Sequence, residues 1–248
     1  MRVKSLILHI FLFAALFYAS TPAAHAACRD ITFEARPYTV CQATSADDLR
    51  LFHTAPDGQP YTAFQPIIDD LAGQGATLGF AMNAGMFHRD YAPVGLYIDP
   101  SKRTDIITSD GPGNFGLLPN GVFCIADTFA VIESRNYQAN PPTCTYATQS
   151  GPMLVINGAL HPKFLPNSDS VNIRNGVGVS ADGTTAIFAI SNTPVNFHQF
   201  ARLFRDVLKT PNALYLDGSI SRLYAPDLKR HDGGFPLGPI IGTVIPKP

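Results

Sequence analysis

Short apolar segments bounded by turn residues dominate the chain and predict β-strands. Ile31, Phe33 and Ala35 alternate with polar residues, which is the period of a half-buried strand. Elsewhere the apolar residues are consecutive and are bounded by Gly, Pro, Asn or Asp, a pattern that favours buried strands. Strands are therefore expected within residues 28–51, 77–82, 94–98, 122–125, 129–133, 153–156, 177–179, 185–190 and 213–216.

Turn signals join several of these strands into hairpins. Asn157-Gly158 follows segment 153–156, and Asp182-Gly183 lies between segments 177–179 and 185–190. Asn-Gly and Asp-Gly are the pairs that tight hairpin turns favour. The neighbouring segments 122–125 and 129–133 form a third expected hairpin.

Helical spacing occurs in two places. The first stripe ends at Gly73 and comprises Phe64, Ile67, Ile68 and Leu71. The second comprises Phe197, Phe200, Ala201, Phe204, Val207 and Leu208, with Asn196 and Gln199 placed to form a capping box. The chain end, residues 227–248, is expected to be mostly coil with one apolar run. Strands outnumber helices and do not alternate with them, which predicts a single α+β domain with a mixed, largely antiparallel β-sheet core flanked by a few helices.

The beginning of the chain has the pattern of a secretory signal peptide. A basic start containing Arg2 and Lys4 precedes an apolar stretch at 6–18 and a small-x-small cleavage site at 24–26. The apolar stretch is too short and wrongly flanked for a membrane anchor. His25 also lies where a lipoprotein signal has an aliphatic residue.

This pattern predicts the domain organisation and the location of the protein. We expect a cleaved signal peptide over residues 1–26 and one domain over residues 27–248. The protein is then periplasmic or secreted, without stable membrane insertion after cleavage.

All four cysteines lie beyond the expected cleavage site, which favours disulfides in an oxidising compartment. Of the three possible pairings, Cys28–Cys41 with Cys124–Cys144 closes the shortest loops and is preferred. Zinc is the alternative, but the chain has no Cys-x-x-Cys and no His at matching spacing.

Charge excludes several classes of partner. The chain has 18 Lys and Arg against 19 Asp and Glu, a net charge of −1. So balanced and sparse a charge implies neither nucleic acid nor an anionic membrane surface as partner. A His-x-x-x-His pair and an EF-hand loop are both absent from the sequence, so we predict no metal and no other cofactor. A divalent ion held by Asp217 and loop carbonyls is the alternative.

Four polar segments that contain glycine follow or interrupt the apolar runs: residues 83–88, 149–152, 173–176 and 216–219. Glycine permits close approach of the backbone to a ligand. Asp217 ends an expected buried strand, where a carboxylate is costly unless it is paired, hydrogen-bonded or functional. Each segment alone is also an ordinary turn, so the inference of a site rests on their combination.

In this order the four segments resemble the phosphodiester glycosidase family, whose founding member removes N-acetylglucosamine from the mannose-6-phosphate tag. The resemblance covers about residues 79–224, and segments 93–97 and 113–115 resemble a bacterial exported branch. Two positions depart from the family pattern. Ala84 precedes Gly85 where many members have a further glycine, and Ser219 replaces a second glycine after Asp217.

The resemblance implies hydrolysis of a sugar-1-phosphodiester at the anomeric carbon, with a phosphate monoester as leaving group. Asp217 would be the base or the nucleophile, and Arg174 would clamp the phosphate bidentately. The implied substrate-binding residues are Asn83, Gly85, Gln149, Ser150, Gly151, Gly218 and Ser219.

Two alternatives compete with this interpretation. A serine hydrolase would use Ser150, but a nucleophile elbow has glycine where this chain has Thr148 and Pro152. A non-catalytic exported module could bind glycan or cell envelope with the same loops. Most glycosidases use two carboxylates. Asp90 and Asp110 are the only candidates for the second, and a phosphate leaving group removes the need for one.

Overall fold

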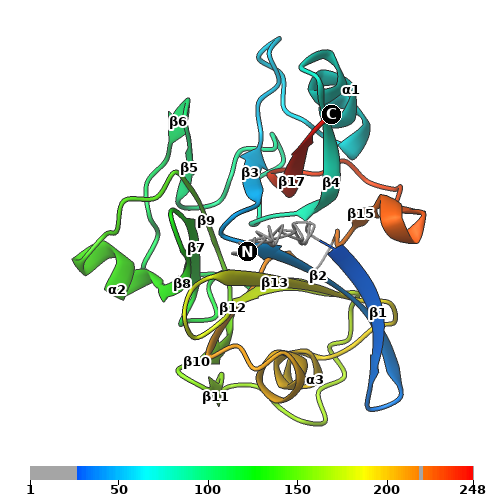
Figure 1. Cartoon of the computed structure of the whole chain (residues 1–248). Coiled ribbons are helices and arrows are strands. Elements are labelled where there is room, and N and C mark those ends of the chain that lie inside the picture. Colours follow the sequence, from blue (N-terminus) through cyan, green and yellow to red (C-terminus); the bar gives the residue numbers. More distant parts are fainter. Residues whose placement is uncertain (1–26, 218–219, 248) are drawn as a thin grey trace, which may run out of the picture.

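Three antiparallel sheets make up most of the computed structural model, which describes residues 27–217 and 220–247 (Figure 1). The expected signal peptide, Gly218 and Ser219 lie outside the described residues. The largest sheet has seven strands. Their order is β1 (Ala27–Phe33), β2 (Arg36–Thr44), β13 (Thr185–Ser191), β12 (Asn175–Val179), β14 (Asn212–Tyr215), β10 (Met153–Ile156) and β11 (Ala159–Leu160).

The other two sheets have five strands each. One has the order β16 (Arg230–His231), β15 (Leu223–Ala225), β4 (Ala76–Asn83), β17 (Ile240–Pro246) and β3 (Asp48–Phe52). The other has the order β6 (Lys102–Arg103), β5 (Tyr97–Asp99), β9 (Tyr146–Ser150), β7 (Gly121–Ile125) and β8 (Phe129–Glu133). Every strand pair among the described residues is antiparallel, which confirms the largely antiparallel part of the prediction.

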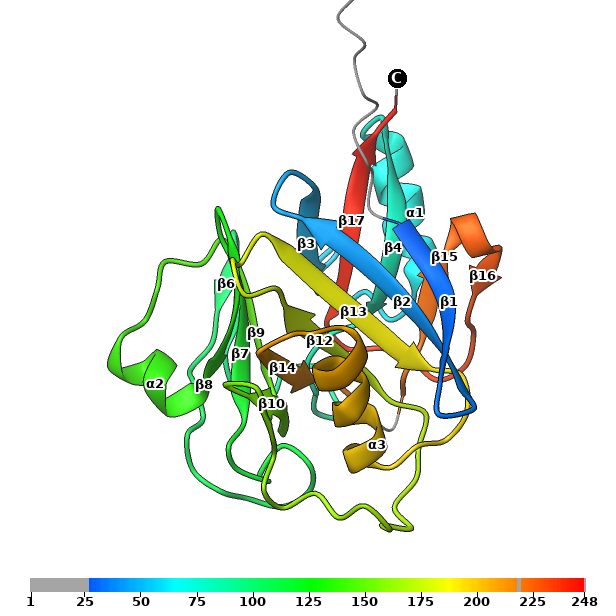
Figure 2. The ribbon, with the colours of Figure 1, turned by 60° about the horizontal axis from the view of Figure 1, so that its bottom comes forward.

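Each sheet carries a helix (Figure 2). Helix α1 (Phe64–Gly73) packs on β4, and α2 (Ser134–Ala139) follows β8. Helix α3 (Phe197–Arg202) covers the seven-stranded sheet and continues as a π-helical turn, Leu203–Val207. The predicted capping box of Asn196 and Gln199 is confirmed. A 3-10 turn, Pro226–Leu228, follows β15.

Strand residues alternate between a shared core and the outer helices. In β13, Phe188 and Ile190 point into the cluster that all three sheets enclose. Ile187 and Ala189 of the same strand point toward α3. Because both faces are covered, the strand is apolar at consecutive positions, as the runs in the sequence indicate.

A glycine in β12 lets the segment after the π-helical turn pack closely on the seven-stranded sheet. In β12, Val177 and Val179 face the shared core, whereas Gly178 faces outward. A Cβ on Gly178 would lie 2.5 Å from Oγ1 of Thr210, closer than unbonded atoms approach. Any larger residue at this position would therefore separate β12 from the segment that follows the π-helical turn.

Two sequence expectations differ from the structure. The strand expected at 94–98 is confined to Tyr97–Asp99, because Gly95 adopts φ +75° and packs against the side chain of Gln149. The chain end was expected to be mostly coil, yet its apolar run forms β17, which lies between β4 and β3.

Both preferred disulfides are present. Cys28 and Cys41 lie opposite each other in β1 and β2, and Cys124 of β7 is bonded to Cys144. Two disulfides are compatible with an exported protein. Over the part of the chain that the structure describes, no helix has the length and apolar character needed to cross a membrane.

Candidate active site

The side chain of Asn175 joins the ends of three strands. Antiparallel pairing places the start of β12 beside the end of β14, and β4 ends next to them at Asn83. Oδ1 of Asn175 accepts hydrogen bonds from Asn83 Nδ2 (3.2 Å), the Asp217 backbone N–H (3.1 Å) and Ser221 Oγ (3.2 Å). Its Nδ2 donates to the Asn83 carbonyl at 2.8 Å. The backbone of Asp217 is thereby fixed at the end of β14.

Asn83 extends these contacts to the next strand. Its Oδ1 accepts the backbone N–H of Arg222 at 2.9 Å, just before β15 begins. Asn83 and Asn175 are both buried, so their amide groups depend on these partners. We call Asn83, Asn175, Asp217, Ser221 and Arg222 the asparagine network. Its hydrogen bonds connect segments that are far apart in the sequence and hold the ends of β4, β12 and β14 together.

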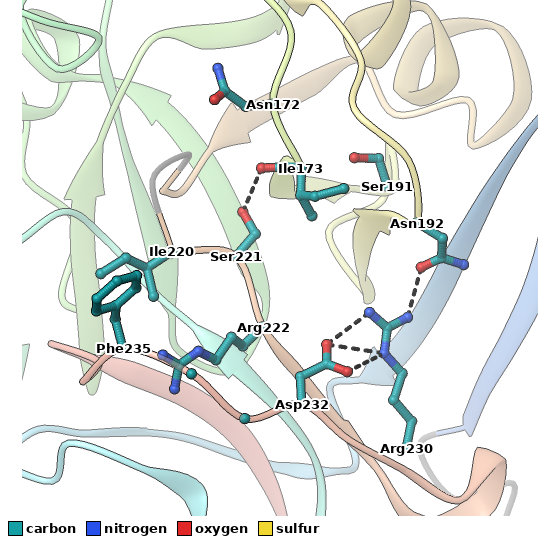
Figure 3. A pocket seen from close by; sticks show the side chains of 12 residues that line it. Asn172, Ile173, Ser191, Asn192, Ile220, Ser221, Arg222, Arg230, Asp232 and Phe235 are labelled. Atoms are coloured by element: carbon teal, nitrogen blue, oxygen red, sulfur yellow. Dashed lines mark hydrogen bonds and ion pairs between the residues drawn. The ribbon is translucent and has the colours of Figure 1, made fainter.

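A polar cavity of about 650 Å³ adjoins this network (Figure 3). Ser221 belongs to both: it lines the cavity, and its Oγ contacts the carbonyls of Asp217 at 2.7 Å and Ile173 at 3.0 Å. Asp217 itself is 8% exposed. The cavity therefore lies within one side chain of the backbone of the predicted catalytic carboxylate.

Two arginines line the cavity, and they differ in whether the protein supplies partners for their guanidinium groups. Arg230 is paired with Asp232, with Nη2 and Oδ2 2.8 Å apart, and its Nη1 donates to Asn192 Oδ1 at 2.7 Å. Arg222 is only 7% exposed, and its Nη2 has no hydrogen-bond partner in segments 27–217 and 220–247. Burial lowers the pKa of Arg222, while the charge of Asp232 opposes that shift. Asp232 is paired with Arg230, and within the described residues it forms no ion pair with Arg222.

Arg174, the predicted phosphate clamp, is not at this cavity. Its side chain is completely buried between the rings of Phe197 and Tyr215, with Cζ 3.7 Å from the Phe197 ring centroid. Nε donates to the Val195 carbonyl at 2.8 Å, Nη1 to Tyr215 Oη at 3.1 Å and Nη2 to the Ser170 carbonyl at 2.9 Å. Burial lowers the pKa of Arg174. In this geometry Arg174 supports loops beside the cavity and offers no free edge to a phosphate.

Gln149 and Ser150 point to opposite faces of β9. Ser150 Oγ donates to the carbonyl of Leu216, directly before Asp217. The Gln149 side chain instead binds the segments that flank the β5–β6 hairpin: its Oε1 accepts from the N–H groups of Leu96, just before β5, and Ile107, after β6, both at 3.0 Å. Ser150 thus supports the strand that carries Asp217, whereas Gln149 is occupied by backbone groups on the other face.

The two described glycines of the predicted site serve close packing. A Cβ on Gly85 would lie 2.4 Å from the Gln149 carbonyl oxygen, and one on Gly151 would lie 2.6 Å from Asn120 Cβ. Neither glycine lines the cavity. Ala84, at a position where family members have glycine, is buried in the shared core. The predictions for Gly218 and Ser219 concern residues outside those described.

The candidates for a second carboxylate are exposed. Asp90 accepts the N–H of Ala92 at 3.1 Å, a contact within its own turn, and Asp110 lies in the glycine-rich loop. Neither lines the cavity. The described residues also contain no group of three or more His, Cys, Asp or Glu side chains that could hold a metal ion.

Sequence reasoning missed the residues that line the cavity. They are Ser221, Arg222, Arg230 and Asp232, together with the network residue Asn175. One signal was available, because Arg222 is a charged residue between Asp217 and the apolar start of β15. The turn between β15 and β16 brings Arg230 and Asp232 to the cavity, and no sequence motif indicated that turn.

Comparison with known protein families gives the class of this domain. The phosphodiester glycosidase family model matches residues 76–236, and the chain belongs to that family. The uncharacterized protein YigE of Escherichia coli (strain K12) is 34% identical over 200 residues, which cover 80% of this chain and 77% of YigE.

A solved structure supports the fold independently. It is the catalytic domain of zebrafish N-acetylglucosamine-1-phosphodiester alpha-N-acetylglucosaminidase, auto-inhibited by its pro-peptide. The TM-score is 0.60 at 14% sequence identity, covering 91% of this chain and 85% of the zebrafish chain. At this identity the likeness concerns the fold.

Proposed function

We propose that this protein hydrolyses a sugar-1-phosphodiester, or a related glycan linkage, in the cavity beside Asp217. Family membership supports the hydrolase class. The observation that supports the assignment is the placement of Asp217: it follows a buried strand, its backbone N–H is bonded to Asn175, and Ser221, which contacts its carbonyl, lines a polar cavity. Glycoside hydrolysis requires a carboxylate at the anomeric carbon.

The bond that breaks joins the anomeric carbon to a phosphate oxygen. Asp217 either attacks that carbon, forming a glycosyl ester that water then hydrolyses to release the sugar and regenerate the carboxylate, or removes a proton from the water that attacks it. The phosphate monoester leaves with the bonding electron pair, and a water proton is released to solvent or to the monoester. Because a phosphate monoester is stable as an anion, the departing group does not need a second carboxylic acid.

We also propose that the active domain spans residues 27–248 and works in the periplasm or outside the cell after removal of residues 1–26. The two disulfides support an oxidising compartment. N-terminal sequencing of the exported protein tests the boundary: the expected first residue is Ala27. Protein recovered with residues 1–26 still attached would contradict it.

Phosphate monoester release from a panel of sugar-1-phosphodiesters, including UDP-N-acetylglucosamine, tests the reaction. Asp217→Asn should lower turnover at least about a hundred-fold, because an amide is neither nucleophile nor base. Asp90→Asn and Asp110→Asn are matched controls at exposed positions, and both should retain most activity. Circular dichroism and unfolding measurements establish that each variant is folded.

The outcomes separate the remaining interpretations. Equal turnover by wild type and Asp217→Asn would make Asp217 a structural residue and refute the mechanism. Binding of sugar phosphates without any turnover would identify a non-catalytic glycan-binding module. Ser150→Ala should remain active, since Ser150 Oγ is already bonded to the Leu216 carbonyl; complete loss of turnover with an intact fold would favour a serine hydrolase.

A further inference from the structure

Arg222 is a buried cation whose environment is incomplete. It is 7% exposed, and its Nη2 is excluded from solvent without a hydrogen-bond partner in the described chain. Removing a charged group from water is costly unless hydrogen bonds or an opposite charge replace the lost hydration. A buried, unpaired donor in a cavity wall therefore indicates that a ligand supplies the missing acceptor.

The guanidinium groups of the two other arginines near the cavity have protein hydrogen-bond acceptors. Arg230 has carboxylate, amide and hydroxyl partners in Asp232, Asn192 and Thr39. Arg174 uses all three of its guanidinium nitrogens on protein oxygens. Within the described residues, Arg222 is bonded to another side chain through its backbone N–H, which donates to Asn83, and the charge of Asp232 acts on its guanidinium. The difference cannot be attributed to exposure, because Arg174 is the more deeply buried of the two.

Geometry around Arg222 suits an oxyanion. The backbone approaches Nη2 closely: Gly234 has φ +132°, and a Cβ there would lie 3.1 Å from this nitrogen. The only carboxylate lining the cavity, among the described residues, is Asp232, and Arg230 neutralises it. An anion that enters thus meets a planar guanidinium, which matches phosphate oxygens.

We propose that Arg222 binds the phosphate of the substrate, in place of the buried Arg174. The identity of the anion rests on the proposed function. Asn83 fixes Arg222 through its backbone, and Asn175 connects Asn83 to Asp217. One hydrogen-bonded network therefore positions the cation for the leaving group and the carboxylate for the anomeric carbon.

Phe235 extends this subsite toward the rest of the leaving group. Its side chain is 77% exposed and lies beside Arg222 and Ile220 at the cavity (Figure 3). An exposed aromatic ring next to a phosphate-binding cation provides a surface for a sugar, base or acyl group. The ligand class is a phosphate ester that carries such a group, and inorganic phosphate should bind less tightly than the ester.

Equilibrium binding to the full chain tests the proposal without requiring turnover. Inorganic phosphate and glucose-6-phosphate, a phosphate monoester of the kind that leaves in the reaction, are titrated by calorimetry into wild type, Arg222→Gln and the charge-matched control Arg29→Gln, which lies exposed on β1. Arg222→Gln should bind both ligands at least about ten-fold more weakly, whereas Arg29→Gln should bind like wild type. Phe235→Ala should weaken binding of the sugar phosphate and leave inorganic phosphate unchanged.

If Arg222→Gln does not fold, Arg222→Lys replaces it in the experiment. Lysine keeps the positive charge but lacks the planar guanidinium that can bind two phosphate oxygens. This variant should bind phosphate several-fold more weakly than wild type. Unchanged affinity in a folded Arg222 variant, or no phosphate binding by wild type, would overturn the proposal. Wild type that binds phosphate through Arg222 but hydrolyses no phosphodiester would refute only the proposed reaction, so the two failures are distinguishable.

Discussion

At the scale of single residues, His161 is held as a neutral imidazole by two contacts of opposite kind. Its Nε2 donates to the Leu118 carbonyl at 3.1 Å, and its Nδ1 accepts the Lys163 backbone N–H at 3.2 Å. The side chain is 2% exposed, and burial lowers its pKa from the ordinary 6.5. Protonation would turn Nδ1 from an acceptor into a donor, and this donor would face the backbone N–H of Lys163.

Stability should therefore fall as the pH drops below about 6.5. In that range the unfolded chain binds a proton at His161 that the folded chain does not, so unfolding becomes more favourable as the pH falls. The change from one such group is at most about 1.4 kcal/mol per pH unit. Urea unfolding of His161→Gln between pH 7 and pH 5 should show a smaller slope than wild type. His88→Gln, at an exposed position, should keep the wild-type slope.

The sequence did not indicate which side chain of each predicted segment points toward Asp217. Segments 149–152 and 173–176 do contact the site, but neighbours in a strand point to opposite faces. Asn175, not Arg174, faces Asp217, and Ser150, not Gln149, faces Leu216. Both faces of these strands are covered, so polarity did not reveal which neighbour faces inward.

At the scale of elements, Asn175 acts as the connection between β4, β12 and the end of β14. Asn175→Ala would leave the Asn83 carbonyl and the Asp217 N–H without these partners. Because each unpaired buried group costs about 1–3 kcal/mol, the free energy of unfolding should fall by roughly 2–4 kcal/mol. Phosphodiester turnover should decrease as well. Asn167→Ala, on an exposed loop, should change neither quantity; equal effects in both variants would contradict this role.

Elements made by local pairing were predictable. The hairpins β7–β8, β10–β11 and β12–β13 follow from apolar runs and turn residues close in sequence. Strand β9 was not predicted, because Thr148, Gln149 and Ser150 make it polar. Their side chains find buried partners in distant segments, and no local pattern carries that information.

At the scale of the whole molecule, one disulfide joins β1 to β2 within the seven-stranded sheet, and the other joins β7 to Cys144, just before β9. Cys124–Cys144 closes a loop of sequence separation 20, which restricts the unfolded chain. Cys124→Ala/Cys144→Ala should lower the free energy of unfolding by about 3 kcal/mol in denaturant titrations. Reductant should destabilise wild type at least as strongly. Insensitivity of wild-type unfolding to reductant would show that the bonds do not contribute.

The assembly of the sheets lay beyond prediction. Strand β14 lies between β12 and β10, and β17 lies between β4 and β3, so neighbours in space are distant in the chain. The cavity exists only because these non-local pairings bring Asn172, Ser221 and Arg230 together. The family resemblance predicts Asp217 and Asn83 as site residues, whereas the shape and charge of the cavity depend on tertiary contacts that periodicity does not encode.

The exposure of Phe235 has a spectroscopic consequence. The chain contains no tryptophan, so its intrinsic fluorescence comes from tyrosine, and emission at the longer wavelengths of indole is absent. A single indole placed at position 235 would be the sole emitter of that kind and would lie at the cavity rim beside Arg222. Its wavelength and quenching would report occupancy of the cavity optically, without a label and without contributions from any other position in the protein.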